Sequence, residues 1–219
     1  MKIRIYGSII LMTILIFSRL CGAGDSDPAE SWGSMSFSQI DEAFDLLDVG
    51  SFQFGEAEKY FDSIIQGCPG SDECASAYYG KGRVLNDDKE EYQRAVWYFD
   101  KALELDPSCC QCLDQKSWSL FSLEDYDGAM QAVNDALEMC PTNAHAWNNK
   151  GIYYYLHYED YKRALECFNT AIKLKPDFGD AWWDKYKAHL MLGQKDEADA
   201  ALATAMEYGI SEQGTEQEE

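Results

Sequence analysis

Small and apolar residues recur along this chain at a regular spacing. The unit is an alanine, an apolar residue four positions on, an alanine three positions later and a proline five further on. Three consecutive copies are Ala95, Phe99, Ala102 and Pro107; Ala129, Val133, Ala136 and Pro141; and Ala164, Phe168, Ala171 and Pro176. Partial copies are Ala57, Phe61, Ile64 and Pro69 upstream, and Ala198, Leu202 and Ala205 downstream. The first alanines are 38, 34, 35 and 34 residues apart, which predicts a repeat protein.

Each period predicts two antiparallel helices. Alanines let two helices approach closely, and the apolar residue one turn later fills the space between them. The proline ends a helix because its ring has no N–H and clashes with the preceding turn. One hairpin cannot bury its apolar face, so neighbouring hairpins must stack. We therefore expect an all-α, right-handed superhelical solenoid of antiparallel helix hairpins.

The first helix of each period carries a second signature. Trp147 is followed by Gly151 and Tyr154, Tyr78 by Gly82, and Trp182 opens the last copy. This pattern resembles the tetratricopeptide repeat (TPR) family over residues 38–209. The resemblance implies about four TPR units behind a degenerate N-terminal hairpin, and a scaffold that serves many kinds of partner.

Two departures from the family pattern concern packing. Ser117 and Tyr186 stand where glycine is usual. We expect those two helix pairs to pack less closely than the others. The last helix is expected over 198–208, with Gly209 as its stop signal.

The N-terminal residues have the pattern of a targeting segment. Lys2 and Arg4 precede an apolar run over 5–17, and small residues follow up to Gly24. This favours a secretory signal peptide over 1–24, with an uncleaved signal anchor or a buried helix as alternatives. Leu20 is too bulky for the usual lipoprotein pattern at Cys21. Residues 25–37 are expected to be a flexible linker, and 210–219 an acidic, disordered tail.

Six of the eight cysteines are expected at one end of the hairpins, because the start of a first helix lies beside the end of a second. They are Cys68, Cys74, Cys109, Cys110, Cys112 and Cys140. Cys110 or Cys112 should lie near Cys140, while Cys74 should lie near Cys109 or Cys110, or pair with Cys68. An exported protein favours disulfides; buried thiols and a metal site are the alternatives. Cys167 is expected to be a buried free thiol.

In TPR proteins the first helices line the concave face, and this resemblance implies the candidate binding residues. Counted from the Trp147 and Trp182 anchors, they are Tyr79, Arg83, Asp114, Gln115, Trp118, Phe121, Asn148, Asn149, Ile152, Tyr155, Trp183, Asp184, Lys187 and Met191. About half of them are expected to pack between repeats instead. TPR domains that capture a C-terminal carboxylate use a Lys and Arg clamp with Asn. That clamp is missing here, so a peptide or protein segment of apolar and basic character fits better.

The net charge of the chain argues against two kinds of partner. The chain has 18 basic and 39 acidic residues, a net charge of −21, and loss of residues 1–24 would make it −24. Such a surplus of acid argues against nucleic acid and against adhesion to anionic membranes. The three histidines, His145, His157 and His189, form no metal-spaced pair and adjoin no nucleophile, so we expect no enzyme and no cofactor.

Three classes of function remain. The preferred one is an exported, cell-surface or extracellular scaffold, monomeric, that binds a peptide or protein partner through an aromatic and amide-lined groove. The alternatives are a structural subunit of a cell-surface or envelope assembly, and a thiol-redox or metal-binding protein that uses the cysteine cluster.

Overall fold

A computed structural model describes residue 44 and residues 54–68, 72–87 and 91–210. The targeting segment over 1–24, the linker over 25–37 and residues 211–219 lie outside the described residues. In the described part, every regular element is a helix. No helix in these ranges has both the length and the apolar character needed to cross a membrane.

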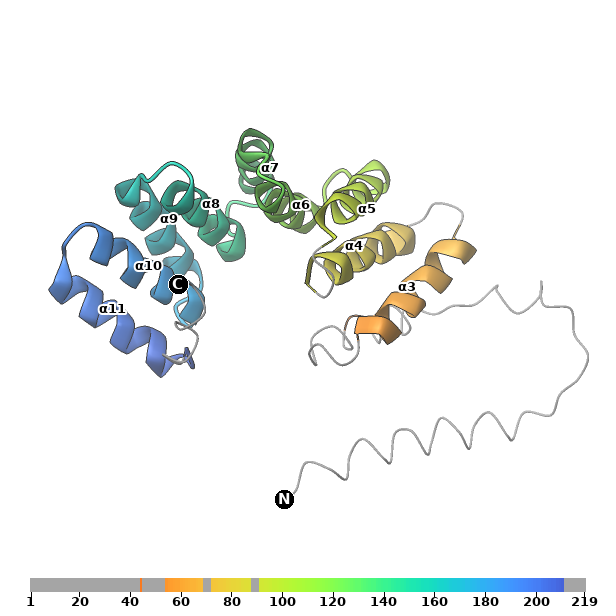
Figure 1. The fold of residues 1–219 in the computed structure, drawn as a ribbon. Helices are drawn as coiled ribbons and strands as arrows, with labels where there is room; N and C mark the ends of the chain where they lie inside the picture. Colours follow the sequence, from red (N-terminus) through yellow and green to blue (C-terminus); the bar gives the residue numbers. More distant parts are fainter. Residues whose placement is uncertain (1–43, 45–53, 69–71, 88–90, 211–219) are drawn as a thin grey trace, which may run out of the picture. The chain divides into compact units, whose positions relative to one another are not determined.

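The helices follow one another as hairpins (Figure 1). They are α3 (Phe54–Gly67), α4 (Asp72–Asp87), α5 (Tyr92–Leu105), α6 (Cys110–Ser122), α7 (Tyr126–Met139), α8 (Ala144–Leu156), α9 (Tyr161–Leu174), α10 (Gly179–Met191) and α11 (Lys195–Glu207). The pairs α4–α5, α6–α7, α8–α9 and α10–α11 each pack together, and each pair packs on the next. This confirms the predicted all-α solenoid of helix hairpins.

The repeated alanines and aromatics form the core between the helices. Phe99 and Phe168 are buried, and each lies against a glycine of the preceding helix, Gly82 and Gly151. A Cβ atom at Gly82 would lie 2.5 Å from the ring of Phe99, closer than real side chains approach. The glycine of the first helix and the phenylalanine of the second are therefore a matched pair that sets how closely the two helices pack.

In the α6–α7 hairpin, different residues occupy the two positions where the helices meet. Ser117 occupies the glycine position and is fully buried, and the position of Phe99 and Phe168 is taken by the smaller Val133, which is also fully buried. The Ser117 hydroxyl donates to the backbone carbonyl of Asp114 at 2.7 Å and lies 2.9 Å from the Tyr153 hydroxyl. The α6–α7 pair packs as extensively as the α8–α9 pair, so the expectation of looser packing at Ser117 is wrong; the smaller partner leaves room and the hydroxyl is hydrogen-bonded.

The turns explain why tryptophan and proline occur together. The indole N–H of Trp147 donates to the backbone carbonyl of Pro141 at 2.9 Å, and that of Trp182 donates to Pro176 at 3.0 Å. Each bond ties the start of a first helix to the proline that ended the helix before it. The spacing from proline to tryptophan is therefore a structural requirement of the turn.

Helix ends follow ordinary capping rules. The carboxylates of Asp125 and Asp160 accept from the backbone N–H three residues on, at the starts of α7 and α9. Gly209 has φ +92°, as expected for a residue that stops a helix. Ile210, which sequence assigned to the tail, lies against Gly179, where an added Cβ atom would approach its side chain to 3.1 Å.

Candidate functional site

The first helices of the hairpins form a common face with a hollow in it. Besides packing within the hairpins, α4 contacts α6, α6 contacts α8, and α8 contacts α10. The hollow on this face has a volume of about 490 Å³. Its polar lining residues are Asp87, Gln115, His145, Asn148, Asn149, Asp180 and Asp184. Its apolar lining residues are Trp118, Ile152, Phe178 and Trp183. These residues define the hollow.

Amide and carboxylate side chains bridge consecutive first helices along the hollow. The Asn149 amide Nδ2 on α8 donates to Asp114 Oδ1 on α6 at 2.9 Å. The Asn148 amide Nδ2 donates to Asp184 Oδ2 on α10 at 3.0 Å. Lys187 Nζ lies 2.8 Å from the other oxygen of Asp184. The two asparagines therefore hold neighbouring repeats together, one in each direction, and we call these bonds the ladder.

The ladder leaves one buried polar atom without a partner. Asn148 is only 4% exposed and lines the hollow. Its Oδ1 is buried and accepts no hydrogen bond from the described part of the chain. Buried polar atoms are nearly always paired, so this oxygen is an exception, an unpaired acceptor enclosed within the wall of the hollow.

Burial changes the acid–base behaviour of two residues here. It raises the pKa of Asp114 to about 6, even though hydrogen bonds from Asn149 and Asn143 act in the opposite direction. Burial and the nearby positive charge of Lys175 lower the pKa of His145, against the opposing effect of Asp180. His145 is therefore neutral at pH 7 and adds no positive charge to the hollow.

The structure brings together half of the fourteen residues that the sequence placed on this face. Those that line the hollow are Gln115, Trp118, Asn148, Asn149, Ile152, Trp183 and Asp184. Asp114 lies in the ladder, and Lys187 is paired with Asp184.

The remaining candidates do not line the hollow. Tyr79 packs against Phe99, and the Phe121 ring stacks on Tyr153 with centroids 4.4 Å apart. Arg83 lies 3.9 Å from Asp87, and Tyr155 packs edge-on against Tyr161. Met191 is 53% exposed outside the hollow. Tyr79 and Phe121 belong to the packing between helices, because their rings fill space there.

Sequence reasoning missed four lining residues. Asp87 ends α4, His145 and Asp180 lie in the first turns of α8 and α10, and Phe178 is the N-cap of α10. The count began at the residue after each tryptophan, so it left out the residues before Trp147 and Trp182 at the starts of α8 and α10. Pro141 and Pro176 were a usable signal for three of the four, because His145, Phe178 and Asp180 follow them within four residues and line the hollow.

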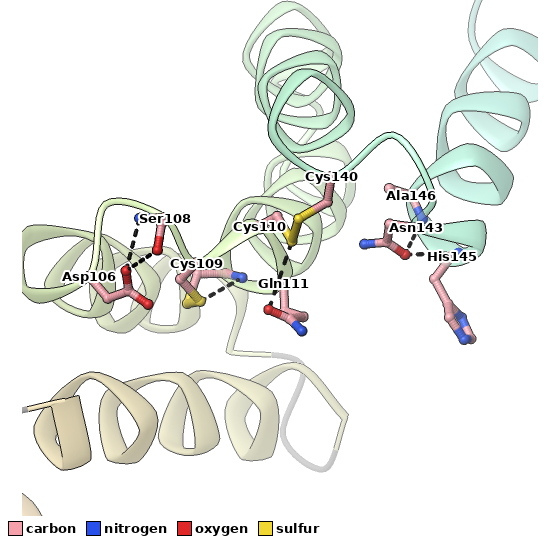
Figure 2. The surroundings of a disulfide bond; sticks show 10 residues. Asp106, Ser108, Cys109, Cys110, Gln111, Cys140, Asn143, His145 and Ala146 are labelled. Carbon is pink, nitrogen blue, oxygen red and sulfur yellow. Dashed lines mark hydrogen bonds between the residues drawn. A yellow bond between two sulfur atoms is a disulfide. The ribbon is translucent and has the colours of Figure 1, made fainter.

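The six cysteines at the hairpin ends are paired as disulfides. The bonds join Cys68 to Cys74, Cys109 to Cys112, and Cys110 to Cys140. Cys110–Cys140 ties the start of α6 to the end of α7, with Cα atoms 6.1 Å apart (Figure 2). Of the options left open for Cys74, the structure has the bond to Cys68.

Cys167 is buried and unbonded, and burial raises its pKa to about 11. Across the described ranges, no three His, Cys, Asp or Glu side chains are grouped so that they could hold a metal ion.

Comparison with known families agrees with the repeat pattern. The tetratricopeptide repeat model matches residues 75–109, 111–143 and 144–178. Residues 75–178 therefore belong to the tetratricopeptide repeat family. A comparison of the whole sequence with curated proteins finds no match.

Solved structures with the same fold are distant in sequence. A thermophilic TPR protein of Thermus thermophilus, TTC0263, superposes with a TM-score of 0.69 at 18% identity, over 81% of this chain and 93% of that one. MamA from Desulfovibrio magneticus RS-1 superposes at 0.60 with 21% identity, over 84% and 99%. YrrB, described as a TPR protein with an unusual peptide-binding site, superposes at 0.54 with 21% identity, over 81% and 88%. At these identities the likeness shows the fold alone.

Proposed function

We propose that this chain is an exported, non-catalytic scaffold that holds a peptide or protein segment in the hollow of its first-helix face. The observation that carries the proposal is the hollow itself, a space of about 490 Å³ that is lined by two tryptophans and by amide and carboxylate side chains. Aromatic side chains supply contact area, and unpaired polar atoms fix the register of a bound chain.

The fold supports a binding role. TPR proteins are interaction scaffolds, and YrrB is described as having a peptide-binding site. Peptide recognition on such a face needs backbone partners as well as side-chain pockets. The side-chain amides of Gln115 and Asn149 line the hollow and have the right chemistry to bond a peptide backbone.

Two features support export. The charged and then apolar residues over 1–24 have the pattern of a signal peptide or signal anchor. The three disulfide pairs in the described part fit an oxidising compartment. The mass of the protein isolated from its own cells tests this, because retention of residues 1–24 rules out cleavage and leaves an anchor or a buried helix.

Partner capture tests the binding role. The purified chain is used to capture proteins from an extract of its own cells, in parallel with the variants Trp118→Ala and Trp183→Ala. Trp97→Ala is the matched control, because Trp97 is 51% exposed on the second helix α5 and lies outside the hollow.

We expect one or more captured proteins to be lost with both hollow variants and kept with the control. Capture that survives both hollow variants contradicts the proposed site. We also expect a monomer; a sedimentation coefficient that rises with protein concentration would favour the assembly alternative.

A further inference from the structure

The lining of the hollow is rich in hydrogen-bond acceptors and lacks positive charge. Three carboxylates line it, from Asp87, Asp180 and Asp184, and no lysine or arginine of the described chain does. Asp184 is already paired with Lys187, and Asp87 lies 3.9 Å from Arg83. Asp180 has no ion-pair partner in the described part of the chain. The Asp180 carboxylate therefore lines the hollow without an ion pair in the described ranges, while Lys175 Nζ lies 4.9 Å from the ring of Phe178, which also lines it.

The unpaired oxygen of Asn148 is an independent sign that a donor belongs here. Its amide nitrogen is committed to Asp184, which fixes the orientation of the side chain and aims Oδ1 away from that bond. Because Asn148 is only 4% exposed, solvent satisfies this oxygen poorly, and a small movement of the wall that let a ligand N–H reach it would be favourable.

The tryptophans give a third observation. Five of them lie in the described residues. Each of the three outside the hollow carries a lysine of this chain over its ring: Lys101 on Trp97 at 5.8 Å, Lys150 on Trp147 at 5.4 Å, and Lys185 on Trp182 at 4.8 Å.

The two tryptophans in the hollow differ from the other three. No cation of the described chain lies over Trp118 or Trp183. A cation over an indole face is attracted by the ring quadrupole. Trp118 and Trp183 thus lack the lysine that the other tryptophans have, although the ring of Tyr186 lies 5.1 Å from the ring of Trp183.

We propose that the hollow is a subsite for one arginine side chain of the bound peptide. The guanidinium stacks on Trp118 and Trp183, faces the Asp180 carboxylate, and donates an N–H to Asn148 Oδ1. This inference rests on the proposed function and names the side chain that the hollow selects.

Arginine fits better than lysine for a geometric reason. A guanidinium is planar, so it can stack on an indole, and it offers five N–H donors in a fixed fork to several acceptors at once. An ammonium is a strongly hydrated point charge without a flat face. We therefore expect a lysine peptide to bind more weakly than an arginine peptide.

The test uses a short capped peptide, acetyl-Gly-Gly-Arg-Gly-Gly-amide. The matched probe replaces arginine with citrulline, which has nearly the same shape and no charge. The full-length chain carries ¹⁵N in its indole groups, and binding is followed by NMR at about 0.15 M salt. The indoles of Trp147 and Trp182 serve as internal references, because they are hydrogen-bonded to Pro141 and Pro176.

The arginine peptide should shift the indole signals of Trp118 and Trp183 and leave the two reference signals in place. The citrulline peptide should bind about tenfold more weakly or worse. Asp180→Asn should weaken the arginine peptide about three- to fivefold. Asp199→Asn removes the same charge from an exposed site on α11 and should have no comparable effect.

Asn148→Leu tests the unpaired oxygen, and unchanged reference signals show that it folds. It should weaken the arginine peptide about tenfold, because the N–H would meet no acceptor. Equal binding of the arginine and citrulline peptides overturns the cation subsite, as does a weakening by Asp199→Asn that matches Asp180→Asn. If the arginine peptide does not bind, while Trp118→Ala and Trp183→Ala still abolish partner capture, the arginine subsite is wrong and the proposed function stands.

Discussion

Replacing Asp114 with asparagine should flatten the dependence of folding stability on pH. Asp114 is 4% exposed, and its pKa in the folded chain is about 6 against an ordinary value of 3.8. The cause is burial, which the hydrogen bonds from Asn149 and Asn143 only partly offset. In the asparagine variant the side chain keeps its shape and does not titrate.

The sign of the effect follows from proton binding. Between pH 3.8 and about 6 the folded chain holds a proton on Asp114 that the unfolded chain has lost. The stability that this carboxyl supplies is therefore fully present below pH 3.8 and is lost as the pH rises through about 6. Each tenfold difference in proton affinity is worth about 1.36 kcal/mol, so the full change is about 3 kcal/mol.

The assay is urea unfolding followed by circular dichroism, at several pH values between about 4 and 7.5. The quantity of interest is the free energy of unfolding of the wild type minus that of Asp114→Asn, because other acids contribute equally to both. This difference should fall by about 3 kcal/mol as the pH rises. Asp199→Asn, at an exposed site, controls for the loss of one charge. A difference that stays level with pH would refute the assignment of a raised pKa to buried Asp114.

Three further predictions concern packing, turns and thiols. Gly151→Ala should lower the free energy of unfolding by about 1–3 kcal/mol, because its Cβ meets the ring of Phe168; an unchanged urea midpoint would show that the ring moves aside freely. Glu124→Gly should raise stability by about 0.5–1 kcal/mol, because Glu124 has φ +63° in the α6–α7 turn; a destabilised variant would contradict this. The unfolded, unreduced full-length chain should show two reactive thiols, Cys21 and Cys167, and one if residues 1–24 are removed. A count of all eight cysteines, or of all seven that follow residue 24, would contradict the disulfides.

The repeat fold was predictable because its determinants are local. Alanine, phenylalanine and proline at set offsets decide where two helices touch and where one ends, and Phe168 against Gly151 shows the rule directly. The pairing of Ser117 with a smaller partner, Val133, was not foreseen, because compensation between two helices is visible only when both positions are compared.

The site was less predictable for a similar reason. The bonds from Asn149 to Asp114 and from Asn148 to Asp184 each join different repeats, so they depend on how far one hairpin is rotated against the next. Counting from a tryptophan placed Asn148 on the correct face. It could not show that the amide nitrogen is already used and the oxygen is unpaired.

Whether a protein or peptide partner occupies the first-helix face can be decided by site-specific photo-crosslinking. A photo-reactive phenylalanine derivative is placed at Trp118, at Trp183 or at the exposed Trp97 of α5, in the full-length chain mixed with an extract of its own cells. We expect the same cross-linked protein from positions 118 and 183 and none from position 97. Cross-linking from position 97 alone, or the same product from all three positions, would mean that the partner does not bind in the hollow.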